Sequence, residues 1–174
     1  AMGADEVLHL RADEIPLDSL ASARALTRVA AEYTPDLILL GKESIDDGNM
    51  QVGPMLAELL GLPCLTVVTR LILAGANLTA ECERDEGTAL FEAGLPAVVT
   101  CQKGLNEPRY PSIRGKMAAM KMAIPEEPAA LEAGRIRIAR LIPPPARAGG
   151  RNVGEGAAAV PELIRLLHTE ARVI

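Results

Sequence analysis

Leu37-Ile38-Leu39-Leu40-Gly41 is a run of four aliphatic residues that ends on a glycine. A continuous apolar run of this length is typical of a parallel strand buried on both faces. Before it, apolar residues recur at helical spacing from Leu20 to Tyr33, and Pro35 ends that pattern. Together with an earlier strand at 6–10, the stretch predicts an α/β fold that contains a right-handed β-α-β unit.

The rest of the chain continues the alternation of strands and helices. A helix from Val52 to Leu60, with Pro54 in its first turn, is ended by Gly61 and Pro63. The segments 64–74 and 78–84 are predicted to form a hairpin through Gly75-Ala76-Asn77. Further strands are predicted at 90–91, 97–101 and 135–141, a short helix from Ser112 through Met117, Met120 and Met122, and a closing helix near residues 160–167. We expect the three methionines to fill the core, and residues 125–128 to form a break.

Composition bounds the class of protein. At 174 residues and 49% apolar content, the chain is long enough for one domain with a core, or one domain with an extension. The net charge of −5 argues against a nucleic-acid partner, because phosphate binding requires a basic face. Only two tyrosines and one phenylalanine are present, so no stacking platform for bases is expected. The sequence contains no run of 18 apolar residues, so no membrane span is predicted.

The titratable residues do not form a catalytic pattern. Cys64, Cys82 and Cys101 are far apart, which favours reduced thiols in a cytoplasmic setting. His9 and His168 lack the spacing of a zinc site, so no metal is expected. We find no Ser/His/Asp arrangement, and we do not expect catalytic residues.

The polar loop from Gly41 to Gly53 lies where open α/β sheets bind ligands, at the carboxyl end of a strand. Its glycines permit close approach of the backbone, and the amides at 51–53 would begin a helix whose dipole favours a phosphate. Asp46 and Asp47 suit ribose hydroxyls or the bracing of the loop. The loop matches neither a Walker motif nor G-x-G-x-x-G, and a solvated turn is an equal alternative.

A second loop, Leu105 to Ile113, follows the strand at 97–101. Pro108 and Pro111 fix φ and hold the preceding residues extended, so the loop is stiff but not helical. A stiff loop with an apolar tip at Ile113 is suited to docking a partner. The alternative is an ordinary connection held by a contact between Arg109 and Glu107.

These two loops resemble motifs of one known family. Leu95-Pro96-Ala97-Val98-Val99-Thr100, followed by 105–110, resembles the signature of the beta subunit of electron transfer flavoprotein. The stretch from Gly41 to Pro54 is similar to that family's nucleotide-binding loop, in the same order and at about the same spacing. The tail segments 143–147 and 170–174 also fit, so the resemblance extends over almost the whole chain.

The resemblance implies a parallel-sheet nucleotide-binding fold of the Rossmann type, similar to adenine nucleotide hydrolases. It implies an added β-hairpin and a C-terminal arm, with the family's first strands absent from this chain. On this comparison, an α/β domain spans residues 1–142 and includes a recognition loop at 105–123. The arm and its helix at 143–174 would contact an alpha subunit.

In this family, the subunit holds AMP and the FAD belongs mainly to the alpha subunit. The resemblance assigns AMP to Gly41, Lys42, Ser44, Ile45, Asp46, Asp47, Gly48, Asn49, Met50, Gln51, Val52 and Gly53. Related proteins that bifurcate electrons place a second FAD there instead, although their loop usually has Asp-Gly-Asp where this chain has Asp46-Asp47-Gly48. A nucleotide-binding module similar to stress proteins, without a redox role, is the third alternative.

The resemblance also implies how the subunit meets its partners. It would be a non-catalytic electron carrier in a heterodimer, cytoplasmic and without membrane insertion, that serves flavin dehydrogenases. Ile113 stands where the family inserts a leucine-like side chain into the dehydrogenase. The docking residues implied are Asn106, Glu107, Pro108, Arg109, Tyr110, Pro111, Ser112, Ile113 and, by position alone, Glu83. Glu83 could equally be a solvent-facing charge.

Overall fold

The computed structural model describes residues 1–14, 17–146 and 149–174. The chain divides into two compact units, Ala1–Arg137 and Ile138–Ile174. Each unit is described by itself below.

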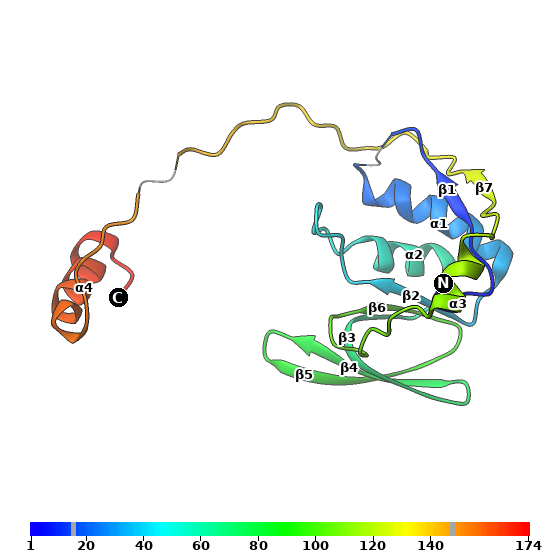
Figure 1. The fold of residues 1–174 in the computed structure, drawn as a ribbon, viewed down its shortest axis with the longest axis horizontal. Coiled ribbons are helices and arrows are strands. Elements are labelled where there is room, and N and C mark those ends of the chain that lie inside the picture. The colour runs from blue at the N-terminus through cyan, green and yellow to red at the C-terminus, as the bar shows by residue number, and fades with distance from the viewer. Residues whose placement is uncertain (15–16, 147–148) are drawn as a thin grey trace. The chain divides into compact units, whose positions relative to one another are not determined.

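The first unit is built on a five-stranded mixed sheet (Figure 1). The strand order is β2 (Leu37–Gly41), β6 (Ala97–Cys101), β3 (Cys64–Ala74), β4 (Asn77–Arg84) and β5 (Gly87–Gly94). β2, β6 and β3 pair in parallel, whereas β3, β4 and β5 form an antiparallel meander. The predicted α/β class is confirmed, and the predicted hairpin continues the parallel part of the sheet.

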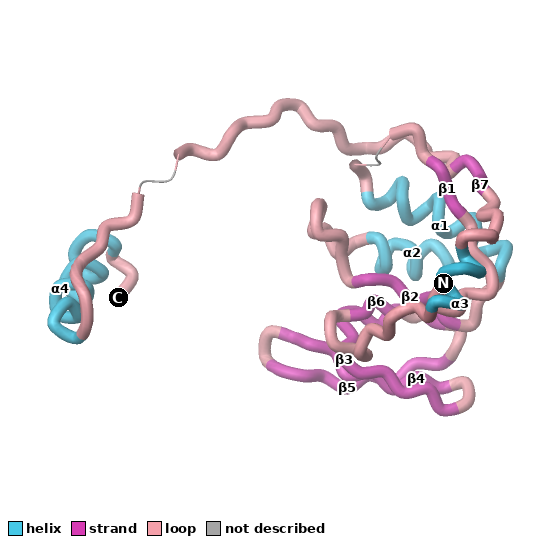
Figure 2. The backbone as a smooth tube through the Cα atoms, in the orientation of Figure 1, coloured by secondary structure: helices cyan, strands magenta, loops and turns pink. Residues whose placement is uncertain are grey.

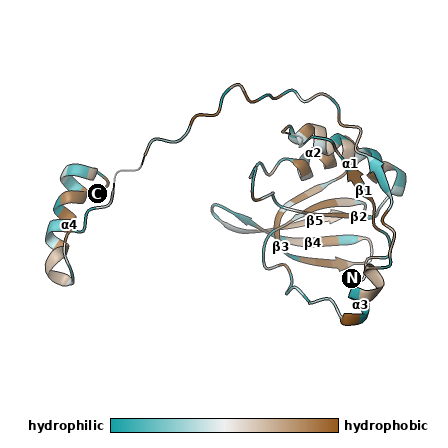
Figure 3. Ribbon diagram, turned by 45° about the horizontal axis from the view of Figure 1, so that its top comes forward, coloured by the Kyte–Doolittle hydropathy of each residue, from teal (hydrophilic) through white to brown (hydrophobic). Residues whose placement is uncertain are grey.

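One face of this sheet forms the core. The register places Cys82 opposite Val68 and Val99 opposite Leu65. The buried cluster consists of Leu65, Val68, Leu78, Ala80, Cys82, Ala97 and Val99. Figure 3 shows that these strands are mainly apolar. Burial raises the pKa of the Cys82 thiol, and the three cysteines are free thiols, which agrees with the expectation of reduced cysteines.

One helix, α2, packs against the parallel strands β6 and β3, and α1 packs on α2 (Figure 2). α1 (Ser19–Tyr33) is capped by Asp18, and α2 (Val52–Leu60) ends at Gly61 with φ +67°. Both helices agree with the prediction. The buried side of α1 differs from the expected apolar stripe, because it is made of small alanines while Leu26 and Tyr33 are exposed.

The predicted β-α-β unit is wrong. β1 is shorter than predicted (His9–Arg11) and pairs in parallel with β7 (Glu126–Pro128), in a separate two-stranded sheet. Residues 126–128, predicted to be a break, therefore form a strand. The pairing is supported by a 3.1 Å hydrogen bond between His9 and Glu126. α1 also contacts this part of the chain, through Arg28 to the carbonyl of Pro128 and through Arg24 to Glu132.

Two other predictions are also corrected. Residues 135–141 form no strand, and the side chains of Ile136 and Ile138 are exposed. α3 (Ile113–Ala119) is present, but Met117, Met120 and Met122 are exposed and do not fill the core. α3 has no buried residue, so this helix does not belong to the core.

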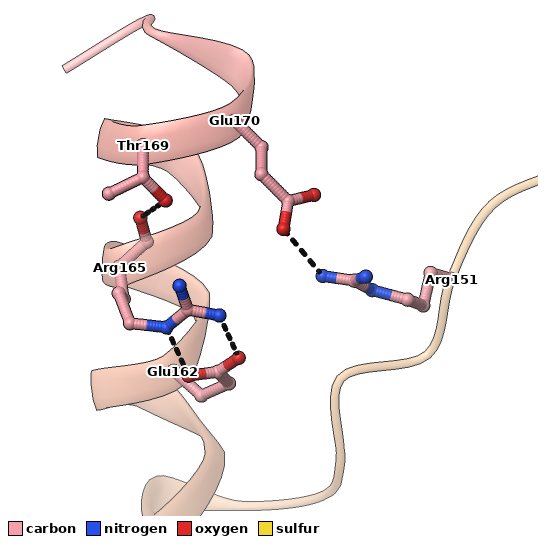
Figure 4. A network of polar contacts seen from close by, with 5 residues as sticks. All are labelled: Arg151, Glu162, Arg165, Thr169 and Glu170. Carbon is pink, nitrogen blue, oxygen red and sulfur yellow. Dashed lines mark hydrogen bonds and ion pairs between the residues drawn. The ribbon is translucent and has the colours of Figure 1, made fainter.

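The second unit contains a short 3₁₀ turn (Ala157–Ala159), α4 (Val160–Leu166) and a π-helical turn (Leu167–Ala171). Figure 4 shows its polar contacts: Arg165 binds Glu162 through two nitrogens at 2.7 Å, and Arg151 lies 3.5 Å from Glu170. The Arg165 guanidinium lowers the pKa of Glu162. Among the described residues, none of the helices is long and apolar enough to cross a bilayer.

Candidate nucleotide site and docking loop

The nucleotide loop lies between the carboxyl end of β2 and the start of α2. The amide of Lys42 donates to the carbonyl of Cys101, which keeps the loop at the edge where β2 and β6 end. A cavity of about 280 Å³ opens there. It is lined by Ser19, Leu40, Gly41, Lys42, Glu43, Ser44, Asp47, Asn49, Met50, Gln51 and Val52.

The starts of two helices meet at this cavity. Ser19 is the first residue of α1, and its hydroxyl accepts a 3.5 Å hydrogen bond from the Asn49 amide. Gln51 precedes α2, and no side chain among the described residues caps its first amides. Free amides at a helix start favour an anion. Ser19 was missed from the sequence, because it lies 30 residues before Asn49 and outside the loop that the motif covers.

Internal hydrogen bonds shape the middle of the loop. The amide of Asp47 donates to the hydroxyl of Ser44 at 3.4 Å and to the carboxylate of Asp46 at 3.1 Å. The Ser44 hydroxyl, followed by the amides of Asp46 and Asp47, lowers the pKa of Asp46. Asp46 therefore braces the loop in its charged form and does not line the cavity.

Three other predicted residues lie outside the cavity lining. Ile45 is fully exposed, and Gly48 adopts φ +62° at the turn. Gly53 is buried where α2 meets β6, and a Cβ atom there would lie 2.3 Å from Cγ2 of Thr100. The structural reason for Gly53 is thus the close packing of a helix on a strand, in place of the predicted backbone approach to a ligand.

The docking loop is exposed at its tip and anchored at its base. Leu105 packs against the core cluster, whereas Tyr110 and Ile113 are 97% and 81% exposed. Ser112 caps α3 by accepting a 3.0 Å hydrogen bond from the amide of Gly115. Arg109 donates to the carbonyl of Met2 at 3.0 Å, so the alternative contact between Arg109 and Glu107 is wrong.

Glu83 lies close to the start of this loop. Its carboxylate accepts a 3.3 Å hydrogen bond from the side chain of Gln102, the residue that follows β6. Glu83 is exposed at the end of β4, and it belongs to the same end of the sheet as the exit of β6. No cluster of metal-ligating side chains occurs among the residues that the structure describes.

The comparisons with known proteins agree with the family resemblance of these two loops. Residues 1–132 match the family model "Electron transfer flavoprotein domain". The beta subunit of electron transfer flavoprotein from Syntrophomonas wolfei is 41% identical over 86% of this chain and 59% of that protein. The corresponding subunits of Bacillus subtilis and Bradyrhizobium diazoefficiens are 37% and 39% identical over the whole chain, which spans 72% and 70% of their lengths.

A match of this extent shows that the chain belongs to the electron transfer flavoprotein family. The relatives just named are beta subunits, so the resemblance read from the two motifs is confirmed. The chain spans about three fifths of the length of the first relative. Electron transport and a flavoprotein context follow from the family.

Proposed function

We propose that this chain acts as the beta half of a heterodimeric electron carrier, with AMP in its nucleotide loop and FAD held mainly by an alpha subunit. In this proposal the chain performs no catalysis, since the redox chemistry belongs to the flavin. It supplies a platform, a bound nucleotide and a surface for flavin dehydrogenases. The exposed and anchored docking loop is the observation that supports the proposal most directly.

The cavity at the nucleotide loop supports AMP as its ligand. Its size, about 280 Å³, lies at the lower end of the roughly 300–1,000 Å³ common for ligand pockets. That size favours a mononucleotide over a second FAD. The uncapped start of α2 suits the phosphate, and the Asn49 amide can pair with either end of the nucleotide. We assign the phosphate to the amides near Gln51 and Val52.

The second unit supports an alpha-subunit partner. Leu141 and Ile142 are 82% and 67% exposed in its extended segment, and Val173 and Ile174 are exposed at its end. Apolar side chains at this density are usual where another protein covers them. We assign this unit, together with the arm at 143–174, to the contact with the alpha subunit.

The docking role is tested by truncating Ile113. In the heterodimer, Ile113→Ala is expected to lower the rate at which a flavin dehydrogenase reduces the bound FAD by about tenfold or more, because a central apolar anchor is lost. Stopped-flow absorbance of the flavin measures this rate. FAD content is expected to stay unchanged.

Ile72 on β3 provides a matched control, since it is an exposed isoleucine outside the loop. Ile72→Ala is expected to leave the reduction rate within about twofold of the parent. Equal rates for Ile113→Ala and the parent protein would overturn the docking role.

A further inference from the structure

The docking loop continues into α3, and this part of the chain is rich in positive charge. Between Glu107 and Glu126 there is no acidic residue, although the whole chain has a net charge of −5. The same segment contains four cations, Arg109, Arg114, Lys116 and Lys121. We call these four residues the basic rim. A local excess of positive charge on an acidic protein creates a field that a partner can sense.

The side chains of the basic rim are available to a partner. All four residues are exposed, and none of them forms an ion pair within residues 1–14, 17–146 and 149–174. Arg109 alone has a side-chain hydrogen bond there, to the carbonyl of Met2. This differs from Arg24, Arg70 and Arg165, which each pair with a carboxylate.

Two residues of the basic rim lie beside an apolar hollow. An open depression of about 610 Å³ on α3 is lined by Ile113, Arg114, Met117, Ala118 and Lys121. The floor of the hollow is apolar, because it is formed by the side chains of Ile113 and Met117, which are 81% and 58% exposed. Two of the four cations, Arg114 and Lys121, thus lie beside the apolar side chains that a partner would cover.

We propose that the basic rim selects redox partners whose docking surface is an apolar pocket ringed by Asp and Glu. This inference rests on the docking function proposed above and adds the partner's charge. Apolar contact at Ile113 would set the lifetime of the complex, while the rim would raise the rate of encounter. An acidic protein fits better than an anionic membrane, because the hollow is concave and the chain as a whole would be repelled by anionic lipid.

The test compares single charge reversals in the heterodimer. Arg114→Glu and Lys121→Glu are each expected to lower the second-order rate of FAD reduction by a flavin dehydrogenase about tenfold at low salt. The parent rate is expected to fall steeply as salt is added, and the three proteins are expected to converge at high salt. Arg11→Glu is the matched control, because Arg11 is an exposed cation on β1 whose side chain makes no ion pair with the described residues. Its rate should stay within about twofold of the parent.

The outcomes separate this inference from the docking function. The basic rim would be overturned if the rates did not depend on salt and both charge reversals matched the parent. If Ile113→Ala still slowed reduction in that case, the docking function would remain intact. If Ile113→Ala also had no effect, the docking function itself would fail. Loss of binding to phosphatidylglycerol vesicles in the two reversals, without any change in the reduction rate, would assign the rim to a membrane and overturn the proposal.

Discussion

At the scale of single residues, Gly53 shows how a site can depend on packing. Its missing side chain lets α2 approach β6, where a Cβ atom would lie 2.3 Å from Cγ2 of Thr100. The hydroxyl of Thr100 in turn accepts a 3.1 Å hydrogen bond from the amide of Val67, so the threonine has a fixed orientation. The start of α2, and with it the nucleotide cavity, is thereby set against the sheet.

Gly53→Ala is expected to destabilise the protein by about 1–3 kcal/mol, because the added methyl overlaps a well-packed side chain. Urea unfolding measures the change. Gly94→Ala is the control, since nothing lies within 4 Å of its Cβ position, and its effect should be within about 1 kcal/mol of zero. Similar losses of stability in both variants would contradict the packing argument.

The amino-acid sequence predicted the position of the candidate nucleotide loop better than it predicted the role of each residue in that loop. Gly41, Ser44, Asn49 and Gln51 line the cavity as expected. Gly53 does not, because a sequence cannot distinguish a glycine that packs on a strand from one that admits a ligand. Ser19 was missed because its approach to Asn49 depends on how α1 packs beside α2.

At the scale of elements, the start of α1 holds a distant segment in place. One carboxylate oxygen of Asp18 accepts from the amide of Leu20 at 2.9 Å, and the other accepts from the amide of Arg135 at 2.7 Å. The same helix contacts that segment through Arg24 and Glu132. A single buried side chain therefore links the helix cap to the chain that follows β7.

These two hydrogen bonds predict a pH dependence. The amide of Arg135, followed by that of Leu20, lowers the pKa of Asp18 below its ordinary value of 3.8. A carboxyl whose pKa is lower in the folded state stabilises the protein above its unfolded pKa, and the effect is lost as pH falls through the folded value. Stability from Asp18 should thus be complete at neutral pH and begin to be lost as the pH falls below about 4.

Asp18→Asn is expected to lower the urea midpoint at pH 7, because Asn has one acceptor oxygen where Asp18 uses two, although that oxygen can still cap the helix. Asp18→Ala should lower the midpoint further. The difference between the parent and Asp18→Asn should shrink as the pH is brought below 4. A difference that is constant from pH 7 to pH 3 would show that the charge of Asp18 does not stabilise this link.

The strands illustrate why some elements were predicted and others were not. The hairpin of β3 and β4 and the buried β6 were predicted, because their apolar runs and turn residues are local signals. The pairing of β1 with β7 joins residues more than 100 positions apart. Local patterns contain no information on that pairing, and the short strands lack a clear period.

At the scale of the whole molecule, the class was predicted more securely than the topology. Apolar content and alternating elements indicated an α/β protein, and the two motifs indicated the family. The mixed character of the sheet was visible only in the structure, since parallel and antiparallel neighbours of β3 have similar sequence patterns. The exposed methionines of α3 were misassigned for a related reason: the same spacing serves a core or a docking surface.

The two proposed sites lie at different loops of the first unit, so their functions can be separated by mutation. The nucleotide cavity depends on the starts of α1 and α2, whereas docking depends on the segment from Leu105 through α3. Variants of one site should leave the other intact. This separation allows the nucleotide content to be measured independently of electron transfer.

The most direct test of the account is the nucleotide content of the heterodimer purified with its alpha subunit. We predict one FAD and one AMP per heterodimer after extraction and chromatography. Gln51→Glu should remove most of the AMP while retaining FAD, because a carboxylate at the start of α2 favours the helix but repels phosphate; Asn77→Asp, which adds the same charge at the β3–β4 turn, should retain both. Two flavins and no AMP, or equal AMP in parent and Gln51→Glu proteins, would contradict the account.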